Sequence, residues 1–111
     1  MEFKHGDLAS GKWQKLSLAG QLANIGSEVS RAMKWRERDS RLFWGAVERT
    51  LELFHLTIAD PRWRSHLKEL TRLREIFCDA VLGGKEYGST LGSLERYFFY
   101  FALYSRKERN N

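Results

Sequence analysis

Apolar residues recur at helical spacing along four stretches of this chain. In the first stretch the gaps between them alternate between four and three residues, which places the apolar side chains in one stripe along a helix. That first stripe consists of Leu18, Leu22, Ile25, Val29 and Ala32. The four stripes together predict helices at about 13–35, 40–59, 61–82 and 91–106.

Residues with helix-capping chemistry stand between the stripes. Asp60 can cap a helix with its side-chain oxygen, and Pro61 suits the first helical position because the N–H it lacks would have no partner there. Gly83–Gly84 favours a helix end, since glycine readily adopts the left-handed conformation beyond the last turn. The other predicted caps are Asp39 or Ser40 for the second helix and Ser89 or Thr90 for the last.

The links between the predicted helices are short, and short links favour antiparallel neighbours. We therefore predict an all-α fold, a single-domain antiparallel up-down-up-down four-helix bundle spanning residues 12–106. Residues 1–11 and 107–111 are expected to be a flexible leader and a flexible tail.

The last predicted helix carries five consecutive aromatic residues, which must point around its whole circumference. One face can bury Tyr97, Phe98 and Phe101, so that Phe99 and Tyr100 point elsewhere. Either a second copy of the chain covers these rings in a homodimer, or another part of the same chain covers them. The candidate interface residues are Tyr97, Phe98, Phe99, Tyr100, Phe101 and Tyr104.

A polar row lies beside the first apolar stripe. Asn24, Glu28 and Arg31 share a helix face at spacings i, i+4 and i+7. The row is either a solvated surface with a Glu28–Arg31 pair or a buried network that specifies helix pairing. Gly26 favours some close approach here, because glycine inside a helix costs about 1 kcal/mol relative to alanine and so suggests a packing reason.

The chain has 111 residues and a net charge of +5, and its positive charge gathers around the first helix. Residues 10–38 hold six Lys or Arg against two Glu. Nucleic-acid binding is therefore the alternative function, with Trp13 and Trp35 either stacking on bases or closing the ends of the bundle. The candidate nucleic-acid contacts are Lys12, Lys15, Lys34, Arg36 and Arg38.

Chemistry-bearing motifs are sparse. Neither a zinc-type cluster nor a glycine-rich phosphate loop is present in the sequence, so we expect no metal, no cofactor and no catalytic residues. Arg49 and His55 resemble the Arg–His motif of the HEPN ribonucleases, in which Arg would hold a phosphate and His would act as acid or base. Six positions rotate the chain by roughly 240° around a helix, so these two side chains should not share a face.

One cysteine, Cys78, cannot form a disulfide within the chain. The longest apolar runs are far shorter than the roughly 18–20 residues that span a bilayer. Both observations favour a cytoplasmic protein with no membrane partner.

Most of the chain, from about 13 to 106, resembles a group of small uncharacterised prokaryotic helical proteins. The segments that carry the resemblance are 21–29, 56–62, 67–75 and 86–90. The predicted fold is also similar to the four-helix bundles encoded in ribosomal-RNA intervening sequences and to HEPN domains, at the level of fold alone. This resemblance implies a bacterial or archaeal protein and brings no activity with it.

Taken together, the sequence predicts a non-catalytic protein-interaction bundle that associates with itself through the aromatic last helix, or with another protein. An RNA- or DNA-binding bundle that uses the basic first helix is the alternative. A HEPN-like ribonuclease is a distant third.

Overall fold

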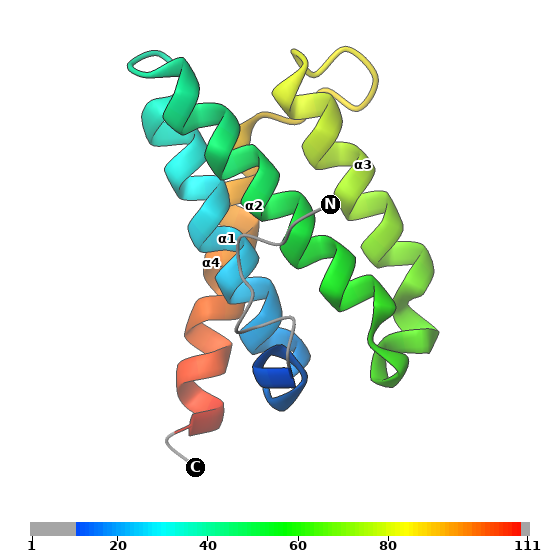
Figure 1. The fold of residues 1–111 in the computed structure, drawn as a ribbon. Coiled ribbons are helices and arrows are strands. Elements are labelled where there is room, and N and C mark those ends of the chain that lie inside the picture. The colour runs from blue at the N-terminus through cyan, green and yellow to red at the C-terminus, as the bar shows by residue number, and fades with distance from the viewer. Residues whose placement is uncertain (1–10, 110–111) are drawn as a thin grey trace.

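The computed structural model describes residues 11–109, and every regular element in that range is helical. Four α-helices pack on one another, as the apolar stripes predict, and their packing is consistent with a bundle. The predicted leader and tail lie partly outside the described residues, at 1–10 and 110–111. The elements in chain order are η2 (Trp13–Lys15), α1 (Leu18–Trp35), α2 (Ser40–Ala59), η3 (Pro61–His66), α3 (Leu67–Val81) and α4 (Leu91–Arg109) (Figure 1).

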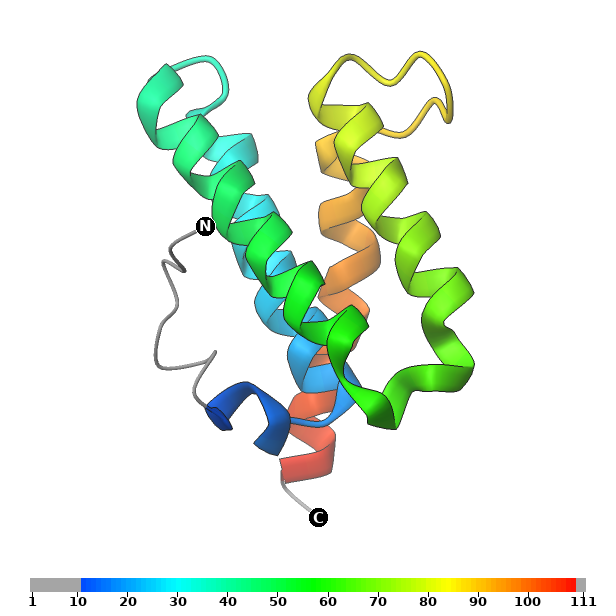
Figure 2. The same cartoon turned by 45° about the vertical axis from the view of Figure 1, so that its right-hand side comes forward.

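Helix α1 is the centre of the packing, because it makes extensive contacts with both α2 and α4 (Figure 1). Helix α3 lies at the edge, against α2 and η3, and touches α4 more sparsely (Figure 2). Large apolar side chains fill the space between the helices. The bulkiest fully buried ones are Trp13, Phe54, Phe77, Phe98, Ile25 and Leu53.

Capping residues mark helix boundaries at positions that the sequence predicts. The Asp39 carboxylate accepts a hydrogen bond from the Leu42 N–H at 3.0 Å, so α2 begins directly after it. Thr90 and Ser93 cap each other, because each backbone N–H donates to the other's hydroxyl at 3.0 Å. Beyond α3, Gly83–Gly84 adopts positive φ angles of 116° and 74°.

The first predicted helix, 13–35, is not continuous. Leu16 is extended, with φ −81° and ψ 148°, and separates η2 from α1. The Ser17 hydroxyl caps α1 by accepting from the Gly20 N–H at 3.1 Å. A tertiary contact holds the break open, since the Arg62 guanidinium donates to the Leu16 carbonyl at 2.8 Å.

The third predicted helix, 61–82, is also divided. Asp60 caps it and Pro61 stands first, as predicted, but the first six residues form the 3-10 helix η3. Trp63 leaves helical geometry at φ −105° and ψ 23°, and its indole N–H donates to the Gln21 side chain at 2.9 Å. Contacts with α1 therefore fix the conformation here, in place of local helix propensity.

Helix α4 extends beyond the predicted end at 106 and includes three residues assigned to the flexible tail. The Ser17 hydroxyl donates to the Glu108 carboxylate at 3.0 Å and ties the last turn of α4 to the start of α1. This bond gives the final turn a tertiary contact that the sequence pattern does not reveal.

Helices α1 and α4 approach closely at Gly26. A Cβ atom added at this glycine would lie 2.4 Å from the Cβ of Phe98, nearer than real side chains come. The close approach that the sequence suggests at Gly26 is therefore present, and Phe98 of α4 is what approaches.

Candidate functional site

Helix α4 buries only one side. Leu91, Leu94 and Phe98 lie in the core, where the Phe98 ring meets the Phe54 ring edge to face with centroids 6.4 Å apart. Phe101 is half-buried against the same core. This buried side is narrower than the sequence analysis assumes, because Tyr97 packs its ring edge on Phe98 and Phe101 yet stays 45% exposed.

The opposite side of α4 presents large apolar side chains to solvent, and we name this set the outer face. Its exposed fractions are 45% for Tyr97, 58% for Phe99, 70% for Tyr100, 46% for Leu103 and 58% for Tyr104. At roughly 200 Å² per ring, the exposed parts of the four rings sum to about 460 Å². The largest apolar patch of a monomeric protein is about 300–600 Å² and is often functional.

A groove runs beside the outer face, between α1 and α4. Its volume is about 440 Å³, and small residues form its floor while Phe99 forms one wall. Ala23, Ser27 and Ala102 also line a second hollow of about 560 Å³ toward the end of α4, so the two are continuous. We name this feature the α1–α4 groove; its small lining residues are Ala23, Gly26, Ser27, Ser30 and Ala102.

Two opposite charges stand side by side on the wall of the α1–α4 groove. Glu95 is half-buried and Arg96 is exposed, and both line the groove. Within residues 11–109, neither side chain forms an ion pair. The groove therefore offers one acid and one base to a partner.

The predicted polar row divides in the structure. Glu28 is buried and pairs with Arg31 one turn later, whereas Asn24 is exposed and donates to the Gly20 carbonyl of its own helix at 2.8 Å. Arg49 of α2 also belongs to this group, although the spacing along α1 gives no sign of it. Its Nε–H donates to Glu28 at 3.1 Å and joins α2 to α1. The row thus contributes one buried carboxylate held by two guanidinium groups.

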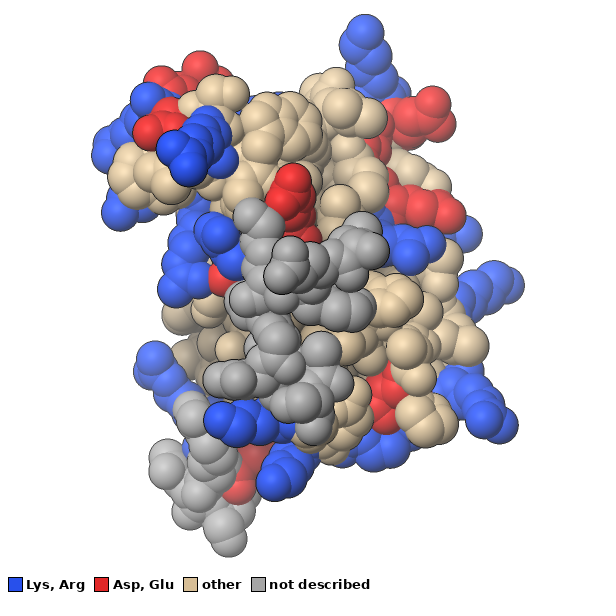
Figure 3. All heavy atoms as spheres, in the orientation of Figure 1, with Lys and Arg blue, Asp and Glu red and all other residues tan. Residues whose placement is uncertain are grey.

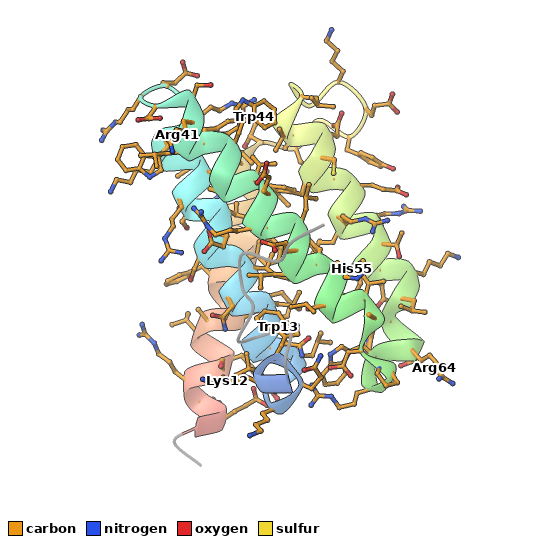
Figure 4. The ribbon with its side chains drawn as sticks, viewed as in Figure 1. Lys12, Trp13, Arg41, Trp44, His55 and Arg64 are labelled. Carbon is orange, nitrogen blue, oxygen red and sulfur yellow. The ribbon has the colours of Figure 1, made fainter. Side chains whose placement is uncertain are left out.

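The Arg–His pair is separated, as helix geometry predicts. Arg49 is directed at Glu28 of α1, while His55 is exposed on α2 (Figure 4). A phosphate-holding role for Arg49 would compete with an ion pair that the fold already contains.

The candidate nucleic-acid contacts fall into two groups at opposite ends of α1. Lys12 precedes η2 and Lys15 is its last residue, and Figure 4 shows Lys12 at that end beside Trp13. Lys34 and Arg38 lie at the other end, where the Lys34 ammonium sits 4.8 Å from the centre of the Trp35 ring. Basic side chains are likewise spread over the face seen in Figure 3, with acidic ones among them.

Two of the residues proposed for nucleic-acid contact have structural partners instead. Arg36 donates to the carbonyls of Ala80 and Val81, at 3.3 and 2.9 Å, and so satisfies the end of α3. Trp13 is fully buried and donates its indole N–H to the Thr57 hydroxyl at 3.1 Å. Trp13 therefore closes the end of the bundle and is not available for stacking on bases.

A buried polar cluster that sequence reasoning missed surrounds Gln21. Its amide donates to the Trp13 carbonyl at 2.9 Å and to Asp60 at 3.2 Å. Hydrogen bonds from the Arg62 side chain hold the pKa of Asp60 below its ordinary value, although burial opposes that shift. The only signal in the sequence was a glutamine one position before the apolar residue Leu22.

In the part of the chain that the structure describes, no three His, Cys, Asp or Glu side chains converge as metal ligands would. Over the same residues, none of the helices combines the length and the apolar character needed to cross a lipid bilayer.

No protein-family model, curated protein or solved structure matches this chain. The resemblance drawn from the sequence stays a prediction. The geometry of α4 and its neighbours is therefore the basis for proposing a function.

Proposed function

We propose that the chain is a non-catalytic protein-interaction bundle whose partner is a second copy of itself. The observation that carries this proposal is the outer face of α4 beside the α1–α4 groove. We also propose that the four helices are arranged in antiparallel up-down-up-down order. The four-residue link 36–39 and the course of the chain in Figure 1 support that order.

The shape of this surface favours a second copy as the occupant. A two-fold interface brings the same patch of both copies together, so the patch must be complementary to itself. Phe99 is 58% and Leu103 46% exposed on α4, and Phe99 lines a groove that is also lined by small side chains. In a two-fold pair, these side chains of each copy would enter the groove of the other.

The charges favour the same occupant. Glu95 and Arg96 are adjacent in the groove, so a two-fold axis near them pairs Glu95 of one copy with Arg96 of its partner. A partner of a single charge would match only one of the two side chains and leave the other facing a like charge.

The exposed rings of α4 also supply more than half of the area that such an interface needs. A stable interface buries about 800 Å² on each partner, and aromatic residues are enriched in its centre. The exposed rings of α4 supply about 460 Å² of that area before the groove is counted.

The test is the mass of the chain in solution, measured by light scattering over concentrations up to about 100 µM, where micromolar dissociation constants are visible. We expect a dimer for the unaltered chain and a monomer for the double variant Phe99→Ser/Leu103→Ser. Trp44→Ser is the matched control, because Trp44 is a 48%-exposed aromatic on α2 and its loss should leave the dimer intact.

A charge exchange tests the pairing directly. Glu95→Arg and Arg96→Glu should each weaken the dimer, since each places like charges together, while the two changes combined should restore it. A monomer at every concentration, or a dimer that survives Phe99→Ser/Leu103→Ser, would contradict the proposal. A mass increase that disappears after nuclease treatment would point to nucleic-acid binding instead.

A further inference from the structure

A separate pocket of about 570 Å³ lies on the other flank of α4, where α1, η3 and α4 meet. Its wall contains four aromatic rings from two elements distant in sequence. The residues that matter here are Leu18, Trp63, Tyr100, Phe101, Tyr104 and Glu108.

The charge of this pocket differs from the charge of the chain. The protein has 19 Lys and Arg residues, yet none of them lines the pocket, and Glu108 is its one carboxylate. The Ser17 hydroxyl donates to Oε1 of Glu108 at 3.0 Å, which orients the carboxylate at the pocket wall. An anionic ligand such as a phosphate would meet a negative charge here, whereas a cation would meet a counter-charge.

The rings supply a second attraction for a cation. The face of an aromatic ring is negative, and cations within about 6 Å of its centre are held by this quadrupole. Trp63 already interacts in this way, since the Arg62 guanidinium carbon lies 4.4 Å from the centre of its ring. That guanidinium is paired with the buried Asp60 carboxylate at 2.8 Å, so its charge is balanced and repels a second cation little.

We infer that this pocket binds an alkylated ammonium group, with the rings of Trp63, Tyr100, Phe101 and Tyr104 around the cation and Glu108 as its counter-charge. Methylated ammonium groups suit such a site because they shed water more easily than a bare ammonium does and present a broad, weakly charged surface to the rings. The group can belong to a small molecule of the choline type or to a trimethylated lysine side chain.

Choline and its neutral isostere 3,3-dimethylbutan-1-ol are the decisive probes, because they share shape and differ in charge. We expect choline to bind with a dissociation constant on the order of 1 mM, measured by titration of its methyl proton resonance, and the isostere at least about fivefold more weakly. A trimethyllysine amide, titrated in the same way, separates the two sources of the ammonium group by its relative affinity. Equal affinities for choline and the isostere, or no binding of either, would overturn the inference.

Variants at Tyr104 separate attraction by the ring from simple apolar contact. Tyr104→Phe keeps the ring and should keep choline affinity, whereas Tyr104→Leu keeps apolar volume and should lose about threefold or more. Glu108→Gln should lose a similar factor by removing the counter-charge. Choline affinity unchanged in both Tyr104→Leu and Glu108→Gln would place the ligand elsewhere.

This inference does not rest on self-association. Tyr100 lines both the α1–α4 groove and this pocket, but neither Phe99 nor Leu103 lines the pocket, so Phe99→Ser/Leu103→Ser should change the mass of the chain and still bind choline.

Discussion

Two regions depart from the usual placement of polar side chains outside and apolar side chains inside. One is the contact between α1 and α2, and the other is the outer face of α4. Between α1 and α2 a carboxylate is buried, but two guanidinium groups hold it. On α4 five large apolar side chains are 45–70% exposed to solvent. A buried polar group with its partners contributes to the specificity of the fold, whereas exposed rings contribute little to it. The difference is the reason for proposing α4, and not α1 or α2, as the interaction surface.

The neighbours Phe98 and Phe99 give the strongest test of the contrast between buried and exposed side chains. Phe98 is 1% exposed and Phe99 is 58% exposed, so the same change should have very different effects. We expect Phe98→Ala to lower the free energy of unfolding by about 3–5 kcal/mol and Phe99→Ala to change it by less than about 0.5 kcal/mol. Chemical denaturation at protein concentrations low enough to keep the chain monomeric measures both. Similar losses from both variants would show that the outer face is covered within one chain.

A pair of glycines gives the next largest effect, with opposite signs. Gly26→Ala places a Cβ against Phe98 and should cost about 2 kcal/mol, even after alanine's better helix propensity is counted. Gly45→Ala on α2 meets only the end of the Arg49 side chain, at 3.5 Å, and should stabilise by about 0.5–1 kcal/mol. Thermal unfolding of the two variants distinguishes them by direction alone. A stable Gly26→Ala variant would mean that α4 moves freely on α1.

The two partners of Glu28 should differ in importance. Arg49 is 29% exposed and joins two helices, whereas Arg31 is 59% exposed and lies on the same helix as Glu28. We expect Arg49→Ala to cost about 1–2 kcal/mol and Arg31→Ala about 0.5 kcal/mol. Urea unfolding at low and moderate salt tests the order, and a larger loss for Arg31→Ala would reverse it.

The smallest expected effect is a dependence of stability on pH. The pKa of Asp60 is lowered in the folded chain by the Arg62 side chain, so the folded state holds its proton less tightly than the unfolded state does. This contribution is present above the ordinary aspartate pKa of about 4 and is lost as the pH falls below it. Unfolding midpoints of the unaltered chain should therefore fall more steeply below pH 4 than those of Asp60→Asn. Parallel curves would remove Asp60 from the acid response.

Local chemistry made the helices predictable. Apolar spacing and the caps at Asp39, Asp60 and Thr90 depend on residues close in sequence, and the structure keeps all three. The breaks at Leu16 and Trp63 could not be foreseen, because partners some 40 residues away fix them.

The candidate site was predictable only in part. Five aromatics in a row necessarily expose some rings, so the sequence indicated an outer face. Neither the groove nor the aromatic pocket has a local signal, since α1 and η3 contribute walls that come from elsewhere in the chain. The contribution of Arg49 to Glu28 is hidden for the same reason.

The shape of the proposed interaction surface depends on Gly26. Because Gly26 has no side chain, Phe98 of α4 packs directly against the backbone of α1. The contact between Gly26 and Phe98 then fixes the depth of the α1–α4 groove, which both residues line. A single added methyl group at Gly26 would therefore change the shape of the α1–α4 groove, although the methyl group itself would not contact a partner.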